Sequence, residues 1–156
     1  QKYPIQLFLL GDGPEKNNLI KQSLNLKNII FKDPIPNSLI PNYISKFDCV
    51  LVSLGEVKLF EYGVSPNKLY DAYSIGRPVI TNIPGFINDE VNNNYLGLTS
   101  KPSDHKQLSI AIKNLMLKSR HERETMGINA RKVAEKYYSR DLVVKGYNNI
   151  LKELLF

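Results

Sequence analysis

The chain has 156 residues, of which 42% are hydrophobic and 23% are charged. This length and composition fit one domain with a packed core, and they exclude an intrinsically disordered chain. No apolar run approaches the roughly 20 residues that a membrane-spanning helix needs. The formal net charge is +6, but the cationic residues are scattered, and their densest region, residues 113–140, also carries glutamates. We therefore do not expect a nucleic acid as a partner.

The cysteine and histidine content argues against a disulfide framework and against a metal site. The single cysteine, Cys49, cannot form an internal disulfide, which fits a reducing compartment and a cytoplasmic protein. It lies within a strand-like run, so we predict that it is a small residue of the core. His105 and His121 stand apart from any cluster of cysteines and carboxylates, and the sequence predicts no bound metal.

Apolar runs typical of buried strands alternate along the chain with helical periods. The sequence predicts strands at residues 5–10, 28–32, 48–53, 78–82 and 96–99. It predicts helices at residues 15–24, 38–47, 66–75, 87–93, 104–116, 120–138 and 141–156. This alternation indicates a three-layer α/β fold, a Rossmann-like parallel sheet flanked by helices, with extra helices at the C-terminal end.

The segment 65–80 predicts a helix with a defined start and end. Ser65 suits the N-cap and Pro66 the first helical position, where its missing N–H costs nothing. Leu69, Ala72 and Tyr73 fall on one buried face, and Gly76 closes the helix before the next strand. The free N–H groups and the partial positive charge at the start of this helix suit a phosphate group.

Ligands of parallel α/β sheets bind beyond the carboxyl ends of the strands. The loops expected there are residues 11–14, 32–36, 54–65 and 82–85. The first of them contains Gly11 and Gly13, which allow a ligand to approach the backbone closely. Their spacing is not the dinucleotide-binding fingerprint, so a simple tight turn is an equally good interpretation of this loop.

Four segments resemble motifs of the C-terminal, donor-binding domain of GT-B glycosyltransferases, in particular family 4, the glycosyl transferases group 1. They follow one another in the order in which the family has them. The segments are residues 7–14, 28–32, 41–53 and 65–80, and the resemblance extends over about residues 5–117. It implies the C-terminal half of a GT-B fold. It also implies that residues 1–156 form a single nucleotide-sugar-binding domain.

The resemblance implies roles for matching positions. Asp71 takes the place of the acidic residue that binds the donor ribose, and carboxylates accept well from paired hydroxyls. The donor diphosphate would contact Ser65, Asn67, Lys68, Gly11 and Gly13, and the base would lie against Lys32, Asp33 and Ile35. The family's first glutamate is absent, since Gly63 occupies its position. Glu61, as a sugar contact, or Glu56 is the expected substitute.

The family implies that the intact protein is a retaining glycosyltransferase of the hexosyltransferase type. It would transfer a sugar from a nucleotide diphosphate sugar to a glycan or lipid-linked acceptor in surface polysaccharide biosynthesis, without a cofactor. We expect the acceptor domain and the first strand of the donor domain to lie upstream of this fragment. The fragment alone would then bind the donor without transferring the sugar.

Three points stay open at this stage. Without that first strand, the remaining five can close into the order 2-1-3-4-5, leave a gap, or borrow a strand. The basic charge and the family indicate peripheral contact with the inner face of the cell membrane. A nucleotide-sugar epimerase of the GT-B fold and a non-catalytic, flavodoxin-like binding module are the alternative functions.

Overall fold

The computed structural model describes residues 3–155, and the chain divides into two compact units with a boundary between residues 42 and 43. The first unit contains a two-stranded parallel sheet, in which Leu7 pairs with Ile29 and Leu10 with Lys32. None of its described residues is buried. Its elements are β1 (Leu7–Leu10), α1 (Lys16–Gln22), β2 (Ile29–Lys32) and the 3-10 helix η1 (Asn37–Leu39). Helix α2 (Ile40–Ile44) spans the boundary between the units.

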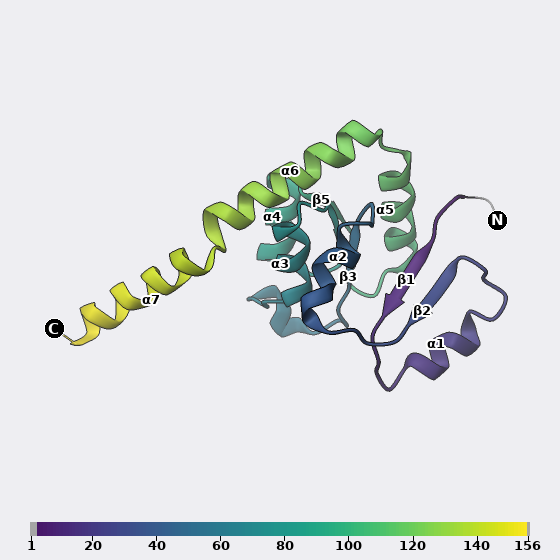
Figure 1. Cartoon of the computed structure of the whole chain (residues 1–156), viewed down its shortest axis with the longest axis horizontal. Helices are drawn as coiled ribbons and strands as arrows, with labels where there is room; N and C mark the ends of the chain where they lie inside the picture. The colour runs from purple at the N-terminus through teal and green to yellow at the C-terminus, as the bar shows by residue number, and fades with distance from the viewer. Residues whose placement is uncertain (1–2, 156) are drawn as a thin grey trace. The chain divides into compact units, whose positions relative to one another are not determined.

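The second unit is built around a three-stranded parallel sheet in the order β3-β4-β5 (Figure 1). Its strands are β3 (Val50–Val52), β4 (Val79–Thr81) and β5 (Gly97–Thr99). Its helices are η2 (Lys58–Glu61), α3 (Asn67–Ser74), α4 (Phe86–Asn93), α5 (His105–Leu117), α6 (Arg120–Tyr137) and α7 (Arg140–Leu155). Within the described residues, the strands of each unit are ordered separately, as β1-β2 in the first unit and β3-β4-β5 in the second.

The three-stranded sheet is covered on both faces, as predicted. Successive residues of β4 point to opposite sides, so Val79 packs into a cluster with α3 and α4, and Ile80 packs into a second cluster with α5. Cys49 packs against this second cluster, and burial raises the pKa of its thiol to about 11. Cys49 is half-buried, so it borders the core rather than lying fully within it as the sequence predicted.

Helix α3 shows the predicted buried face and the predicted end. The side chains of Leu69, Ala72 and Tyr73 are fully buried. At the C-terminal end, the N–H of Gly76 donates to the Tyr73 carbonyl, and the N–H of Arg77 donates to the Ala72 carbonyl. These two bonds form a Schellman motif, which requires the left-handed conformation that Gly76 adopts, with φ of +68°.

The predicted start of this helix is wrong by one position. Pro66 is the N-cap and Asn67 is the first helical residue, so Pro66 does not occupy the first turn. The Ser65 hydroxyl does not cap the helix, because it donates instead to the Tyr70 hydroxyl at 3.4 Å. The predicted helix at residues 38–47 is also too long, since α2 ends at Ile44.

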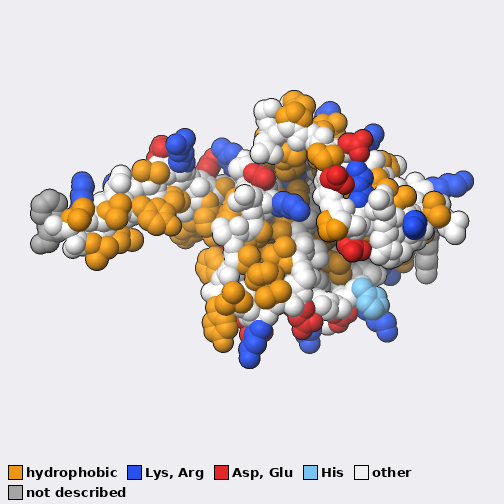
Figure 2. All heavy atoms as spheres, turned by 90° about the horizontal axis from the view of Figure 1, so that it is seen from below, with side chains coloured by type: hydrophobic (Ala, Val, Ile, Leu, Met, Phe, Trp, Pro, Cys, Tyr) orange, Lys and Arg blue, Asp and Glu red, His pale blue; other side chains and the backbone are white. Residues whose placement is uncertain are grey.

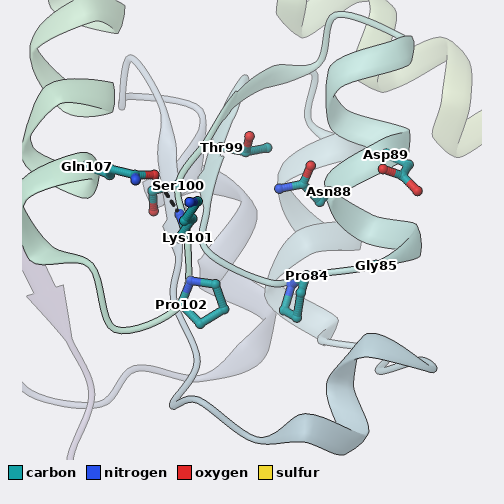
Figure 3. Close-up of a pocket in the computed structure, with 9 residues that line it drawn as sticks. All are labelled: Pro84, Gly85, Asn88, Asp89, Thr99, Ser100, Lys101, Pro102 and Gln107. Carbon is teal, nitrogen blue, oxygen red and sulfur yellow. Dashed lines mark hydrogen bonds between the residues drawn. The ribbon is translucent and has the colours of Figure 1, made fainter.

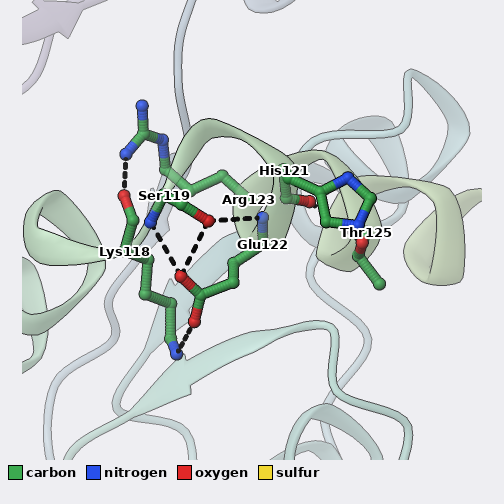
Figure 4. A network of polar contacts seen from close by, with 6 residues as sticks. All are labelled: Lys118, Ser119, His121, Glu122, Arg123 and Thr125. Atoms are coloured by element: carbon green, nitrogen blue, oxygen red, sulfur yellow. Dashed lines mark hydrogen bonds and ion pairs between the residues drawn. The ribbon is translucent and has the colours of Figure 1, made fainter.

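Helix α6 begins with a capping box, shown in Figure 4. The Glu122 backbone N–H donates to the Ser119 hydroxyl, and the Ser119 backbone N–H donates to the Glu122 carboxylate at 2.8 Å. Lys118 forms an ion pair with the same carboxylate at 3.2 Å. The hydrogen bonds from the Ser119 backbone and hydroxyl lower the pKa of Glu122 most, and the contact with Lys118 adds a smaller effect. Together they lower this pKa to about 2.

Helix α7 continues beyond α6, away from the three-stranded sheet (Figure 1), and all its described side chains are exposed. Figure 2 shows hydrophobic side chains along the length of this helix. Its exposed apolar residues are Leu142, Val143, Val144, Tyr147, Ile150, Leu151, Leu154 and Leu155. Within residues 3–155, no helix is long and apolar enough to cross a membrane.

Candidate functional site

The carboxyl ends of β3, β4 and β5 meet at one edge of the sheet, where helices α3, α4 and α5 begin. Two hollows of about 260 and 350 Å³ open at this edge. Ser100 and Lys101, which follow β5, line both of them. Figure 3 shows the smaller hollow, with Asn88 and Asp89 of α4 on one side and Gln107 of α5 on the other.

The larger hollow is bordered by the start of the loop between β3 and α3, residues 53–66, which we call the β3–α3 loop. Asn82, directly after β4, holds this loop through two hydrogen bonds. The Leu54 N–H donates to Asn82 Oδ1 at 2.9 Å, and Asn82 Nδ2 donates to the Leu54 carbonyl at 2.8 Å. Asn82 is buried, and the backbone N–H and carbonyl of Leu54 together satisfy the oxygen and the nitrogen of its side-chain amide.

The same loop contacts the turn after β4 at a second place. Gly85 adopts φ of +68°, and a Cβ added to it would lie 2.3 Å from the Glu61 carbonyl oxygen. The backbone of η2 therefore packs directly on Gly85, and this close approach requires glycine. The contact places Glu61 beside the turn that leads into α4, while its side chain remains exposed.

The N-terminal end of α3 presents the predicted anion-binding features. No side chain caps this end, and the backbone N–H groups of Asn67 and Lys68 have no acceptor within residues 3–155. Asp71, one turn further on, is exposed, and no hydrogen bond or ion pair among these residues reaches its carboxylate. Partial desolvation raises the pKa of the Asp71 carboxyl above its ordinary value.

The first unit brings together part of the remaining predicted set. The Gly11 N–H donates to the Lys32 carbonyl at 3.1 Å, so both residues lie at the carboxyl ends of β1 and β2. Gly11 has φ of +133°, whereas Gly13 does not adopt a positive φ. Asp33 forms an ion pair with Lys16 at 2.8 Å, which lowers the pKa of the carboxyl, and Ile35 is half-buried.

Sequence reasoning missed three groups at this edge. It assigned no role to Asn82, to Ser100 or to Lys101, although the strand-end rule indicated the loop at residues 82–85. The same rule applied to the predicted strand at residues 96–99 points to Ser100 and Lys101. The partner of Asn82 could not be inferred, because Leu54 lies 28 residues away in the sequence.

A parallel α/β domain whose helices begin at an open sheet edge belongs to the class that binds ligands beyond its strand ends. The family model described as "Glycosyl transferases group 1" matches residues 1–133. The chain belongs to this family, as the order of its motifs implied. No curated protein matches the sequence significantly.

Three solved structures share the fold, which is that of GT-B glycosyltransferases. Sucrose-phosphate synthase from Thermosynechococcus elongatus has a TM-score of 0.78 at 19% identity, with 96% of this chain and 38% of that chain covered. HepE from Anabaena, in complex with UDP, has a TM-score of 0.74 at 17% identity, over 97% and 42%. WaaG, a glycosyltransferase involved in lipopolysaccharide biosynthesis, has a TM-score of 0.63 at 21% identity, over 85% and 34%. The chain spans less than half the length of each.

Proposed function

We propose that this chain is the donor-binding domain of a retaining glycosyltransferase that uses a nucleotide diphosphate sugar. The observation that carries the proposal is the open N-terminal end of α3, where two backbone N–H groups and the Asp71 carboxylate one turn away have no hydrogen-bond partner among the described residues. Backbone donors at a helix N-terminus suit a diphosphate, and an exposed carboxylate suits the paired hydroxyls of a ribose. Family membership and the UDP complex of HepE support the same function.

The remaining site residues are proposals that rest on family membership. We propose that Ser65, Asn67 and Lys68 of the second unit contact the diphosphate, and the family implies the same role for Gly11 and Gly13. The base lies against Lys32, Asp33 and Ile35, and Glu61 contacts the sugar. The nucleotide sugar is the substrate, and we propose no cofactor.

The wider setting is also a proposal. The acceptor is a glycan or a lipid-linked glycan of a surface polysaccharide pathway, and it binds to an acceptor domain of the intact protein. The sugar is transferred only when both domains are present. We propose a cytoplasmic protein in peripheral contact with the membrane, and the net charge of +6 and the apolar side of α7 support the membrane contact.

The test is a titration of the chain with UDP, GDP, ADP and their sugars, followed by amide NMR shifts. We expect saturable shifts of the Asn67 and Lys68 amides with one nucleotide. Asp71→Ala should weaken that binding about ten- to a hundred-fold, since a hydrogen bond to a charged group contributes about 1.5–3 kcal/mol. Asp141→Ala, which removes an exposed carboxylate in the first turn of α7, is the matched control. If none of these nucleotides or their sugars binds saturably, a donor-binding role for this chain is refuted.

A further inference from the structure

The turn between β4 and α4, residues 82–85, holds the β3–α3 loop at two points. At the first point, both polar atoms of the Asn82 amide bond the backbone of Leu54, as an added strand residue would. The turn itself is fixed, because the Ile83 N–H donates to the Thr81 hydroxyl at 3.2 Å, and Thr81 is fully buried. The first anchor therefore joins the start of the loop to a rigid part of the core.

The second anchor lies seven residues further along the loop, at Glu61. The Gly85 backbone approaches the Glu61 carbonyl so closely that an added Cβ would lie 2.3 Å from the oxygen and 3.0 Å from the carbon. Any other residue at position 85 would have to push η2 away. It would also have to adopt φ of +68°, which L-residues rarely do.

Few buried contacts fix the loop between these two anchors. The short helix η2 and the half-buried Phe60 order part of it, whereas the side chains of Val57 and Leu59 are 47% and 68% exposed. A Cβ added at Gly55 would meet nothing within 4 Å, which shows that the loop is also loosely packed near its start. A segment with few buried contacts opens at low free energy unless specific bonds hold it.

We infer that Asn82 and Gly85 are positioning residues that set where the β3–α3 loop presents Glu61 at the carboxyl edge of the sheet. Neither residue need touch the ligand for this role. The inference rests on the proposed function only for the task of Glu61, the sugar contact. The anchoring of the loop is a property of the chain without ligand and is measured separately.

The first experiment is hydrogen exchange of the ligand-free chain, read over residues 54–62 and over the core strand β4. Asn82→Ala and Gly85→Ala should each raise exchange in residues 54–62 about ten-fold or more, while β4 stays protected. Asn94→Ala removes an amide that also bonds a backbone carbonyl, at the far end of α4, and should leave the loop unchanged. Gly55→Ala adds a methyl group to the same loop in open space and is the control for Gly85→Ala.

The second experiment is binding of the nucleotide and of its sugar by the same variants. The anchor variants should lose about ten-fold in affinity for the nucleotide sugar and much less for the nucleotide alone, because Glu61 contacts only the sugar. Exchange in residues 54–62 equal to that of the controls would overturn the inference. An equal rise of exchange in β4 and in residues 54–62 would also overturn it. Asn82 and Gly85 would then stabilise the whole unit rather than position the loop.

The two proposals fail in different ways. If the unmodified chain binds no nucleotide, the proposed function fails, and the exchange data still decide whether the loop is anchored. The other outcome is that the unmodified chain binds nucleotide while the anchor variants keep the same ratio of nucleotide-sugar affinity to nucleotide affinity as Asn94→Ala. In that case only the positioning role fails.

Discussion

Two glycine backbones approach each other closely where the end of α3 meets α6, and this contact gives the sharpest prediction of stability. Gly127 lies inside α6 and is buried, and a Cβ added to it would be 2.1 Å from the Gly76 carbonyl oxygen. Gly76 closes α3, the helix that carries Asp71. In Gly127→Ala the two backbones must therefore separate by about 1 Å to restore an ordinary contact.

Two terms of opposite sign set the size of the effect. Overpacking of a close contact costs about 1–3 kcal/mol, and we take the upper end because backbone rather than a flexible side chain opposes the methyl group. Alanine in place of glycine within a helix raises the free energy of unfolding by about 1 kcal/mol through its higher helix propensity. The expected net loss of unfolding free energy is about 2 kcal/mol.

Gly146→Ala is the matched control. Gly146 also lies inside a helix, α7, but a Cβ added there would meet nothing within 4 Å. Its replacement should therefore show only the gain in helix propensity. The difference between the two variants isolates the packing cost, about 3 kcal/mol, which corresponds to about 6–12 °C in melting temperature.

Urea and thermal unfolding followed by far-UV circular dichroism measure this difference. If Gly127→Ala proves as stable as Gly146→Ala, the reasoning is refuted, because the two helices would then not be held at the distance described. A selective loss of stability would show that this close contact between α6 and the end of α3 is present in the folded chain.

Two further predictions concern stability. Tyr138→Phe removes the hydroxyl that donates to Glu90 at 2.5 Å and leaves a buried carboxylate without that donor, so unfolding free energy should fall by about 2–3 kcal/mol. Tyr137→Phe, at an exposed neighbour, should change urea unfolding little. Because the pKa of Glu122 is lowered to about 2, its carboxylate stabilises the fold above its ordinary pKa, and this contribution is lost as the pH falls from about 4.5 toward 2. Ser119→Ala should reduce this part of the acid sensitivity of the melting temperature, and an unchanged pH profile would contradict the assignment.

Local rules predicted the middle and end of α3 well. A period of 3.6 residues is a property of neighbouring positions, so the buried face at Leu69, Ala72 and Tyr73 could be identified from spacing alone. The end at Gly76 was predictable because few other residues adopt φ of +68°. The start was missed by one residue, since several residues before Leu69 can cap a helix and only the surrounding contacts select among them.

Contacts between distant segments could not be predicted. The bonds from Asn82 to Leu54 and the contact of Gly85 with Glu61 depend on which strands are neighbours in the sheet, and the sequence alone left the strand order open. The apolar side chains of α7 illustrate the same limit, because their spacing resembles that of a buried helix face although they are exposed. Periodicity indicates which side of a helix is apolar, and it does not indicate what covers that side.

Helix α3 is fixed at its C-terminal end and along its buried face, while no described residue accepts a hydrogen bond from its first N–H groups. The conformational entropy of ordering these donors is therefore lost when the chain folds rather than when a ligand arrives. An anion bound at this end, as proposed, would meet donors that the fold has already ordered, and such preorganisation favours affinity from few contacts. The exposed β3–α3 loop is ordered before ligand binding only near its two anchors, at Leu54 and Glu61.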